Sequence, residues 1–423
     1  MKILLIHNKY KQEPGGETFV FQAEGELLSR HGHFVERLVF DNGKIKTILD
    51  KCLSALKIIY NPESARQLRR KIESFNPDII HVHNFVALAS PAIFYVAKRY
   101  HIPVILTLHN YRLICPSATL FHNQKIYEKS INSIFPMDAI MKGVYRNSRI
   151  QTAIVAFMVA VHNLIGTWRN RIDYYITLSN FAKEKFKMSS LSIPEERLLV
   201  KPNFVPDCGM GDSIRQDYFL YVGRLVEEKG IQTLLSAAKL YNFKLTIVGD
   251  GPLRGSVENA ARTNPNIRCV GFLDKPAIMS HLKKCKALIL PSLWYEAFPL
   301  AMLEAFSTGT VVIASKLGSM AEIIENRVNS LLFEAGNEKD LVRRIIEIDE
   351  EREWARCLAD NARLSYLTHY TPEKNYGLLI NIYNQALALK RQEQDKMFHH
   401  PLPQMHGRKS SGYQYYKTAN QGW

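Results

Sequence analysis

The sequence predicts an α/β protein that consists of two successive Rossmann-like domains. Its 423 residues exceed the size at which a single hydrophobic core usually stops growing. Short β-branched segments alternate with longer amphipathic segments, which is the pattern of a parallel sheet covered by helices. The alternation restarts near residues 201–203, so we expect the second domain to begin there.

Six strands and four helices are expected in the first unit. The strand segments are short and rich in β-branched or aromatic residues. They are 2–7, 34–40, 79–82, 104–108, 174–178 and 198–201. The expected helices are 16–31, 63–75, 90–100 and 180–188. The second of these ends at Asn76, because the residue before a proline is disfavoured in the helical conformation.

The second unit repeats the architecture without repeating the sequence. Its expected strands are 217–222, 244–248, 267–270, 286–290, 311–314 and 330–333. Its expected helices include 230–240, 252–263, 299–308 and 337–350. Residues 392–423 are polar, rich in His, Tyr and Gln, and show no apolar periodicity, which predicts a flexible tail.

Positive charge is concentrated in the first half of the chain. Of the formal net charge of +15, residues 1–203 contribute +12 and residues 204–389 contribute −1. This asymmetry predicts that one domain faces an anionic surface, either a nucleic acid or an acidic membrane leaflet. The sequence has no nucleic-acid recognition motif and no interleaved aromatic stripe, so we expect no nucleic-acid partner.

The N-terminus and the cysteines favour the reducing cytosol. The apolar run before His7 is only four residues long (3–6), which is too short for the core of a signal peptide. The six cysteines are scattered and form no CxxC, so neither a disulfide framework nor a zinc site is predicted. The sequence has no charge-free run of about twenty apolar residues, so a membrane-spanning helix is not expected.

Residues 111–172 form a long insertion that does not fit the alternation of strands and helices. It contains an apolar segment, 150–161, preceded by Arg146 and Arg149 and followed by a tryptophan and two arginines in 168–171. An apolar helix with such flanks suits a membrane interface. A helix buried between the two domains explains the pattern equally well.

Gly15 and Gly16 lie between the first expected strand and the first expected helix. Paired glycines let the backbone approach a ligand closely, and the following helix N-terminus offers free N–H groups to a phosphate. The segment does not match the dinucleotide fingerprint GxGxxG. An ordinary tight turn explains it equally well.

Arg224 and Lys229 lie in the segment 223–230, GRLVEEKG, directly after an expected strand. Ligands of open α/β sheets bind at the carboxyl ends of the strands. Two cations at that edge suit a diphosphate, with arginine as a planar fork and lysine as a point charge. Alternatively, Glu227 and Glu228 neutralise both cations in a solvated turn.

Glu296 and Glu304 are the ends of an E-x7-E segment. Glu296 lies in a loop after an expected strand, and Glu304 lies on the following helix within an otherwise apolar run. Burying a carboxylate there is costly unless it has a hydrogen-bonding partner. Sugar hydroxyls would be suitable partners for both carboxylates. The alternative is that one glutamate stabilises the dipole at the N-terminus of the helix and the other lies in solvent. This alternative accounts for only one of the two glutamates.

His109 ends an expected strand in the segment 107–112. A histidine at a strand end in a cleft can donate to a developing negative charge. A lone histidine is more often a structural residue with satisfied hydrogen bonds.

Together these segments resemble the retaining, nucleotide-sugar-dependent glycosyltransferases of family four, which have the GT-B fold. The resemblance covers about residues 1–390 and follows the order of the family. It rests on GGE (15–17), HNYR (109–112), GRLxxxKG (223–230), VGDGP (248–252) and E-x7-E (296–304). E-x7-E with GRLxxxKG upstream is rarely met outside GT-B transferases.

The resemblance implies two Rossmann-like domains that face a cleft. Residues 1–203 would bind the acceptor, and residues 204–371 would bind the nucleotide-sugar. Residues 372–391 would form a C-terminal helix that crosses back to the N-terminal domain.

Each motif residue has an implied role. The implied donor-binding residues are Gly15, Gly16, Arg224, Lys229, Val270, Phe298, Leu300 and Glu304. The implied catalytic residues are His109 and Glu296, and the implied acceptor-binding residues are Glu17 and Arg112. Among these, Arg224 and Lys229 would hold the diphosphate, Glu304 the ribose, Glu296 a hydroxyl of the donor sugar, and Val270 would meet the base.

The resemblance also implies that the reaction needs neither a metal nor a protein nucleophile. Breaking the anomeric bond builds negative charge on the leaving diphosphate, which Arg224, Lys229 and helix termini would stabilise. The sequence has no DxD motif, so we expect no metal or other cofactor. Many relatives have His-Asp where this chain has His109-Asn110, so no carboxylate role is assigned at position 110.

We therefore expect a cytoplasmic hexosyltransferase that is peripheral at the inner face of the plasma membrane. It would move a hexosyl unit from a UDP- or GDP-linked donor to a lipid-linked or saccharide acceptor in the biosynthesis of a surface polysaccharide. A nucleotide-sugar 2-epimerase with the GT-B fold and a degenerate, non-catalytic membrane-associated homologue are the alternatives. The intact pairs Arg224/Lys229 and Glu296/Glu304 disfavour both alternatives.

Overall fold

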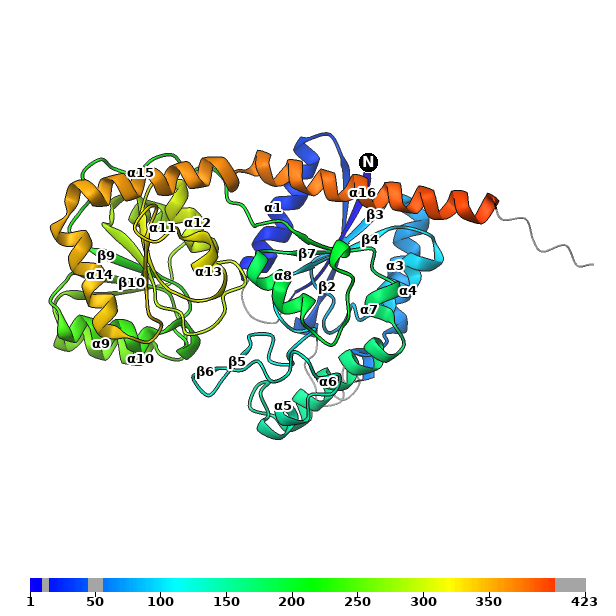
Figure 1. Cartoon of the computed structure of the whole chain (residues 1–423), viewed down its shortest axis with the longest axis horizontal. Helices are drawn as coiled ribbons and strands as arrows, with labels where there is room; N and C mark the ends of the chain where they lie inside the picture. Colours follow the sequence, from blue (N-terminus) through cyan, green and yellow to red (C-terminus); the bar gives the residue numbers. More distant parts are fainter. Residues whose placement is uncertain (10–14, 45–55, 400–423) are drawn as a thin grey trace, which may run out of the picture.

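The computed structural model describes residues 1–9, 15–44 and 56–399. It contains two α/β domains, each built on a six-stranded parallel sheet, and they lie side by side (Figure 1). The predicted fold class is confirmed. The predicted strands all appear, and their bounds differ from the predicted ones by two residues or fewer at each end.

The N-terminal domain has the strand order β2-β1-β3-β4-β7-β8. Its strands are β1 (Lys2–Lys9), β2 (Phe34–Asp41), β3 (Ile79–Val82), β4 (Val104–Leu108), β7 (Tyr174–Thr177) and β8 (Leu198–Val200). The helices that cover it are α1 (Gly16–Arg30), α3 (Pro62–Phe75), α4 (Ala92–Arg99) and α8 (Asn180–Lys187). Strands β1, β3 and β4 are buried on both faces, which explains why they read as continuous apolar runs.

The C-terminal domain has the strand order β11-β10-β9-β12-β13-β14. Its strands are β9 (Phe219–Val222), β10 (Leu245–Val248), β11 (Ile267–Gly271), β12 (Ala287–Leu290), β13 (Val311–Ser315) and β14 (Leu331–Phe333). Its helices are α9 (Ile231–Leu240), α10 (Arg254–Thr263), α11 (Lys275–Lys284), α12 (Leu300–Ser307), α13 (Gly318–Ile323) and α14 (Glu338–Glu350). The strand order reverses between β9 and β12, and in the other sheet between β1 and β3, so each domain has one topological switch point.

Two final helices return the chain from the second domain to the first (Figure 1). Helix α15 (Arg352–His369) packs on the C-terminal domain, and α16 (Pro372–His399) lies along the N-terminal domain. Leu379, Tyr383 and Ala386 of α16 share an apolar cluster with the N-terminal sheet. The helix extends eight residues beyond the predicted end at 391, and 400–423, the rest of the predicted tail, lies outside the described residues.

The insertion 111–172 folds at the edge of the N-terminal domain, away from α16 in the view of Figure 1. It contains a short hairpin, β5 (Phe121–His122) with β6 (Lys125–Ile126), and the helices α5 (Met137–Lys142), α6 (Arg149–Leu164) and α7 (Thr167–Asn170). The inner face of α6 is fixed within this domain, because Nδ2 of Asn163 donates to Ser190 O at 2.9 Å. None of the helices in the described part of the chain is long and apolar enough to span a bilayer.

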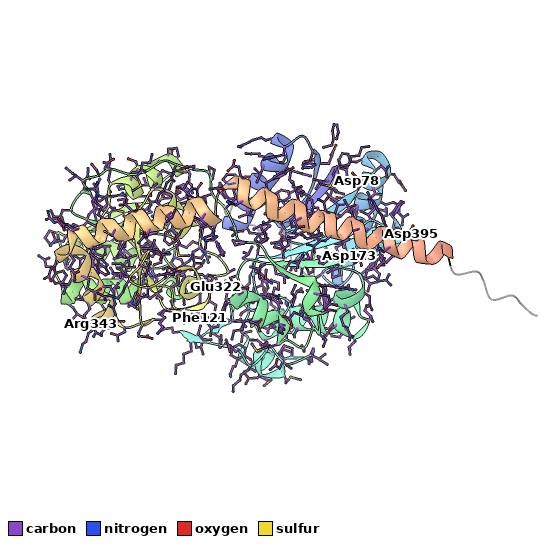
Figure 2. All side chains as sticks on the ribbon, turned by 45° about the horizontal axis from the view of Figure 1, so that its top comes forward. Asp78, Phe121, Asp173, Glu322, Arg343 and Asp395 are labelled. Carbon is purple, nitrogen blue, oxygen red and sulfur yellow. The ribbon has the colours of Figure 1, made fainter. Side chains whose placement is uncertain are left out.

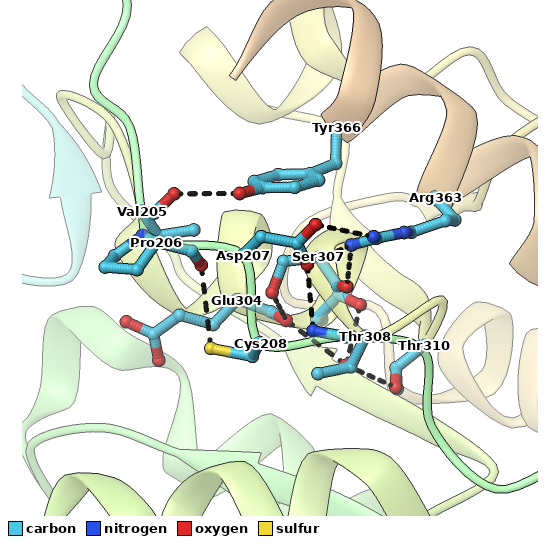
Figure 3. Close-up of polar contacts among 12 residues, drawn as sticks. Val205, Pro206, Asp207, Cys208, Glu304, Ser307, Thr308, Thr310, Arg363 and Tyr366 are labelled. Atoms are coloured by element: carbon cyan, nitrogen blue, oxygen red, sulfur yellow. Dashed lines mark hydrogen bonds and ion pairs between the residues drawn. The ribbon is translucent and has the colours of Figure 1, made fainter. Parts of the chain in front are cut away.

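The segment that joins the domains is fastened to α15 (Figure 3). Both terminal nitrogens of Arg363 donate to the carboxylate of Asp207 at 2.7 Å. The hydroxyl of Tyr366 donates to Val205 O at 3.0 Å. A bidentate arginine–carboxylate pair has a narrow range of geometries, so the joining segment has a defined path.

The domains also touch through α13 and α8. Figure 2 shows Glu322, on α13, at the junction of the two domains. Its carboxylate accepts from the backbone N–H groups of Asn180 and Phe181, at 2.9 and 2.7 Å. These are free N–H groups at the start of α8, where a negative charge is stabilising. The Phe181 and Tyr295 rings contact each other nearby, with centroids 4.6 Å apart and planes inclined by 58°.

Candidate active site

Several of the predicted site residues lie at the carboxyl ends of strands at the two switch points or next to them. Arg224 and Lys229 follow β9, and Glu296 follows β12. Gly16 follows β1, and His109 follows β4. The connections that leave the two strands at a switch point go to opposite faces of the sheet, and ligands of open α/β sheets bind at such a point.

Glu296 accepts three hydrogen bonds on one carboxylate oxygen, Oε1. Nζ of Lys229 lies 2.6 Å away, the hydroxyl of Ser292 2.6 Å and Nε1 of Trp294 2.9 Å. Burial raises the pKa of this carboxyl, but Lys229 and the hydroxyl and indole donors lower it further, so the pKa lies below its ordinary value. Glu296 is therefore an anion, and its second oxygen, Oε2, remains for a ligand.

The turn that carries Arg224 and Lys229 approaches β12 closely at Gly230. Gly230 has a φ of 71°, and a Cβ there would lie 1.7 Å from Pro291 O. No other residue type fits such a contact. The glycine thus lets the lysine of the turn reach Glu296 across the switch point.

Arg224 is available to a ligand. Its side chain is 60% exposed, and its one ion pair is to Glu228, at 3.4 Å. An exposed pair of this kind contributes at most about 1 kcal/mol. Glu228 therefore neutralises Arg224 only weakly. Lys229 forms its ion pair with Glu296 and not with the glutamates of the turn.

Glu304 is buried on α12 and pairs with Lys275, at the start of α11. Burial raises the pKa of Glu304 more than Lys275 lowers it. The Lys275 ammonium also lies 5.4 Å from the centre of the Phe19 ring, on α1 of the other domain. In Figure 3 the backbone of Glu304 bonds with Ser307 and Thr308, while its carboxylate points away from them.

The glycines after β1 face the E-x7-E helix across the domains. Gly15 caps α1, and a Cβ on Gly16 would lie 3.2 Å from Cδ1 of Leu300, the first residue of α12. Phe298 is buried beside that helix, and Val270 is half-buried at the end of β11. The structure therefore brings Gly16 and Leu300 together. Val270 lies farther away, on β11, which is the edge strand of the C-terminal sheet and is separated from β9 by β10.

His109 lies in a pocket at the edge of the N-terminal sheet. The same pocket is lined by His83 and Asn84, which follow β3, and by Asn110 and Arg112, which follow His109 in the sequence. Nε2 of His109 lies 3.0 Å from Nδ1 of His83. Burial lowers the pKa of His109 to about 3, so the imidazole is neutral at physiological pH.

Arg112, the expected acceptor-binding residue, lies in the wall of the same pocket. It is buried, donates to Pro116 O at 3.0 Å, and lies 4.7 Å from the centre of the Tyr145 ring. These contacts fix the wall of the pocket and leave only part of the guanidinium to a ligand.

Glu17 is largely buried at the start of α1. Burial raises its pKa to about 8, so the carboxyl is mostly protonated at neutral pH. Nδ1 of His7 lies 3.7 Å from it, but burial lowers the pKa of His7 to about 4. Two neutral groups do not form an ion pair, so we expect Glu17 to present an O–H donor.

A cluster of Glu24, His81 and His83 lies behind the pocket, with ligand-type atoms within 4.8 Å of one another. Both ring nitrogens of His81 already have partners, the hydroxyls of Tyr383 at 2.8 Å and Thr107 at 2.7 Å. Glu24 is paired with the buried ammonium of Lys201. A metal ion would face that positive charge, so the donor set does not fit a metal site.

Comparisons with known proteins bear on the family and the fold of the chain. Residues 15–207 match the family model "Glycosyltransferase Family 4", and residues 213–365 match "Glycosyl transferases group 1". The crystal structure of Anabaena HepE in complex with UDP superposes with a TM-score of 0.65, at 17% identity, over 93% of this chain and 100% of that one. The chain is a glycosyltransferase of the GT-B type.

Two sequence relatives of this glycosyltransferase are informative. A protein of Klebsiella pneumoniae, described as an uncharacterized 42.6 kDa protein in the cps region, is 24% identical over 83% of this chain and 94% of its own length. The O-antigen chain mannosyltransferase C of Escherichia coli is 25% identical over 42% of this chain and 49% of its own length.

Sequence reasoning missed several residues of this GT-B site. His83 and Asn84 directly follow β3, at the same sheet edge as His109, so the position of HVHN after a strand could have revealed them. Lys275 and Lys201 had no such signal. Their partners, Glu304 and Glu24, lie far away in the sequence, and only the packing of α11 and α1 brings each pair together.

Proposed function

We propose that this glycosyltransferase moves a hexosyl unit from a UDP- or GDP-linked donor, with retention of configuration, to a lipid-linked or saccharide acceptor. The proposed pathway is the biosynthesis of a surface polysaccharide. The observation that carries the proposal is the meeting of Arg224, Lys229 and Glu296 at the β9/β12 switch point. The UDP bound by HepE and the mannosyltransferase activity named for the Escherichia coli relative support it.

Each of the site residues can have a separate role in the transfer. An ammonium has three N–H donors. Lys229 uses one on Glu296, which leaves two for the leaving diphosphate beside the Arg224 fork. Oε2 of Glu296 accepts from a hydroxyl of the donor sugar, and Glu304 exchanges Lys275 for the ribose hydroxyls. Cations fixed at the place where negative charge develops lower the barrier to bond cleavage.

The direct test is a screen of UDP- and GDP-sugars by thermal shift, followed by transfer assays with a membrane extract. We expect one nucleotide class to stabilise the protein and to yield an α-linked product whose anomeric configuration NMR can assign. Turnover of the donor without an acceptor would point to the epimerase instead. Absence of both stabilisation and turnover would contradict any transferase role.

Transfer should not depend on a metal. The proposed cations Arg224 and Lys229 take the place of a metal clamp on the diphosphate. We expect initial rates in EDTA to equal those in added Mg²⁺ or Mn²⁺. Complete loss in EDTA that either ion restores would reveal a metal site that this proposal lacks.

Glu304→Gln and Glu296→Gln should have different effects on the bare nucleotide. The proposed partners of Glu304 are ribose hydroxyls, so Glu304→Gln should weaken nucleotide binding by about 1 kcal/mol, or roughly fivefold. Glu296→Gln should leave that affinity unchanged and lower kcat, because its partner is on the sugar. Calorimetry and steady-state kinetics measure the two effects, with Glu334→Gln, an exposed carboxylate on the same domain, as control. The opposite pattern would mean that Glu296 binds the ribose and Glu304 binds the donor sugar.

We also propose that the α5–α6 segment rests on an anionic membrane surface at the cytoplasmic face. Ile150, Phe157 and Leu164 recur every seven residues on α6, so they form one stripe about 21 Å long. Their side chains are 75%, 50% and 72% exposed. Arg146 and Arg149 flank the stripe and are exposed. An exposed apolar stripe beside basic residues is the pattern of an interfacial helix.

The protein should bind vesicles that contain anionic lipid, release them at high salt and ignore neutral vesicles. Each Lys or Arg near such a surface contributes about 1 kcal/mol, and the attraction fades within a Debye length. Changing Arg146, Arg149, Arg169 and Arg171 to Gln should therefore weaken binding in a co-sedimentation assay and leave nucleotide affinity intact.

A matched control uses four exposed cations of the neutral domain, Lys239, Arg262, Lys339 and Arg352, also changed to Gln. These changes should leave vesicle binding unchanged. A second variant, with Ile150, Phe157 and Leu164 changed to Asn, should lose the apolar part of the binding at high salt. If the wild-type protein shows no preference for anionic vesicles at low salt, a soluble saccharide acceptor is the better proposal.

A further inference from the structure

A series of buried polar side chains runs from the interior of the N-terminal domain to the ligand pocket. Glu24, on α1, is fully buried, and its Oε1 accepts from Nζ of Lys201. Its Oε2 lies 3.4 Å from Nε2 of His83. Nδ1 of His83 lies 3.0 Å from Nε2 of His109, which lines the pocket. The series thus links an internal carboxylate to the proposed catalytic histidine.

The contact between Glu24 and His83 is the one available to both atoms. Oε2 of Glu24 and Nε2 of His83 are buried and lie 3.4 Å apart, and neither atom has a well-aligned hydrogen-bond partner among residues 1–9, 15–44 and 56–399. Leaving a buried donor or acceptor unpaired costs about 1–3 kcal/mol. We therefore expect a hydrogen bond between these two atoms.

All the histidines in this series are neutral. Burial lowers the pKa of His83 well below 6.5 and that of His109 to about 3. Burial raises the pKa of Glu24, but the Lys201 ammonium, which also donates a hydrogen bond to it, lowers the pKa, and the net shift is below the ordinary value, so this carboxyl is ionised. A neutral imidazole has one donor and one acceptor nitrogen, whereas a carboxylate only accepts. The carboxylate therefore determines the direction of every hydrogen bond that follows it.

We propose that Glu24 and His83 are positioning residues that fix the tautomer of His109. Nε2–H of His83 donates to Glu24, so Nδ1 of His83 is unprotonated and accepts from Nε2–H of His109. Nδ1 of His109 is then the unprotonated nitrogen and accepts a hydrogen bond from a hydroxyl group of the bound sugar.

This assignment changes the role expected from the sequence alone, where His109 was a donor to a developing negative charge. As an acceptor, it selects a substrate that carries a hydroxyl at this position over one that carries a carbonyl or a carboxylate. The sugar partner rests on the proposed function above, whereas the tautomers of His83 and His109 do not.

The first experiment reads the tautomers without any substrate. Long-range ¹H–¹⁵N spectra of protein labelled at the histidine rings distinguish a protonated from an unprotonated ring nitrogen, and His83→Gln and His109→Gln assign the signals. In the wild-type protein we expect both His83 and His109 to carry the proton on Nε2. A proton on Nδ1 of His109 would overturn the proposal.

The second experiment removes the carboxylate without leaving a buried charge. In the double variant Glu24→Gln/Lys201→Met, we expect a second His109 signal with the proton on Nδ1, because an amide can donate as well as accept. His162→Gln is the matched control, since His162 is an equally buried histidine of the same domain with partners on both ring nitrogens. It should leave the His109 signals unchanged. An unchanged tautomer in the double variant would also overturn the proposal.

The third readout is kinetic. If transfer occurs, the double variant should lower kcat about 10- to 100-fold, as loss of an orienting partner does elsewhere. The KM for the donor should stay within about twofold of wild type, because the groups that hold the diphosphate are untouched. A wild-type protein with the expected tautomers and no transfer would contradict the proposed function and leave the positioning role standing. A change in KM alone would contradict the positioning role.

Discussion

Lys201→Met is expected to destabilise the N-terminal domain by about 3–5 kcal/mol, because it leaves the carboxylate of Glu24 buried without its partner. Both side chains of the pair are fully buried. Urea denaturation followed by fluorescence should show an earlier unfolding midpoint for that domain. The double variant Glu24→Gln/Lys201→Met should recover most of the loss, because it removes both charges together. Equal destabilisation in the single and double variants would mean that packing, and not charge, dominates at this position.

The pair also predicts a pH dependence. The pKa of Glu24 is lower in the folded protein than its ordinary value of 4.5. Its ionisation therefore contributes stability that is fully present above pH 4.5 and is lost as the pH falls through the folded-state pKa. The double variant should lack this contribution, so its stability should fall less steeply than that of the wild type below pH 4.5.

Lys229→Ala and Arg224→Ala should each weaken binding of the donor's nucleoside diphosphate. A charge-assisted hydrogen bond contributes about 1.5–3 kcal/mol, which corresponds to a loss of roughly 10- to 150-fold. The loss should be smaller for the nucleoside monophosphate, which lacks the second phosphate. Isothermal titration calorimetry measures both affinities.

Arg327→Ala is a suitable control for these two variants. Arg327 also belongs to the C-terminal domain and also pairs with a carboxylate, that of Glu347, at 3.0 Å. Its removal should leave nucleotide affinity unchanged. If neither Lys229→Ala nor Arg224→Ala changes the affinity for the diphosphate, the proposed phosphate site is wrong.

Local patterns predicted the strands and the edge of the sheet at which ligands bind. Strands such as β3 and β13 are short, rich in β-branched residues and buried on both faces, so composition alone identifies them. The carboxyl end of each strand then follows from its sequence limits. This is why Arg224, Glu296 and His109 could be placed at one edge of their sheets from sequence alone.

The partners of these residues could not be predicted in the same way. The sequence suggested that sugar hydroxyls compensate Glu304, whereas in the structure Lys275 of the preceding helix, α11, pairs with it. Likewise, Glu24 reads as an ordinary helical glutamate of α1. Its pairing with Lys201, which follows β8, depends on how α1 packs on the sheet, which no local pattern encodes.

The return of α16 to the N-terminal domain has a consequence for the order of folding during synthesis. Tyr383 bonds with His81 across 302 positions of the chain, and Tyr376 bonds with His33 across 343. The apolar cluster around Ile3 and Leu5 is completed only by residues of this last helix. Such distant contacts form slowly, and domains otherwise tend to fold in the order in which they leave the ribosome. The N-terminal domain therefore leaves the ribosome first but completes its folding last. Until α16 has been synthesised, the apolar surface that this helix covers is exposed and depends on molecular chaperones for protection from aggregation.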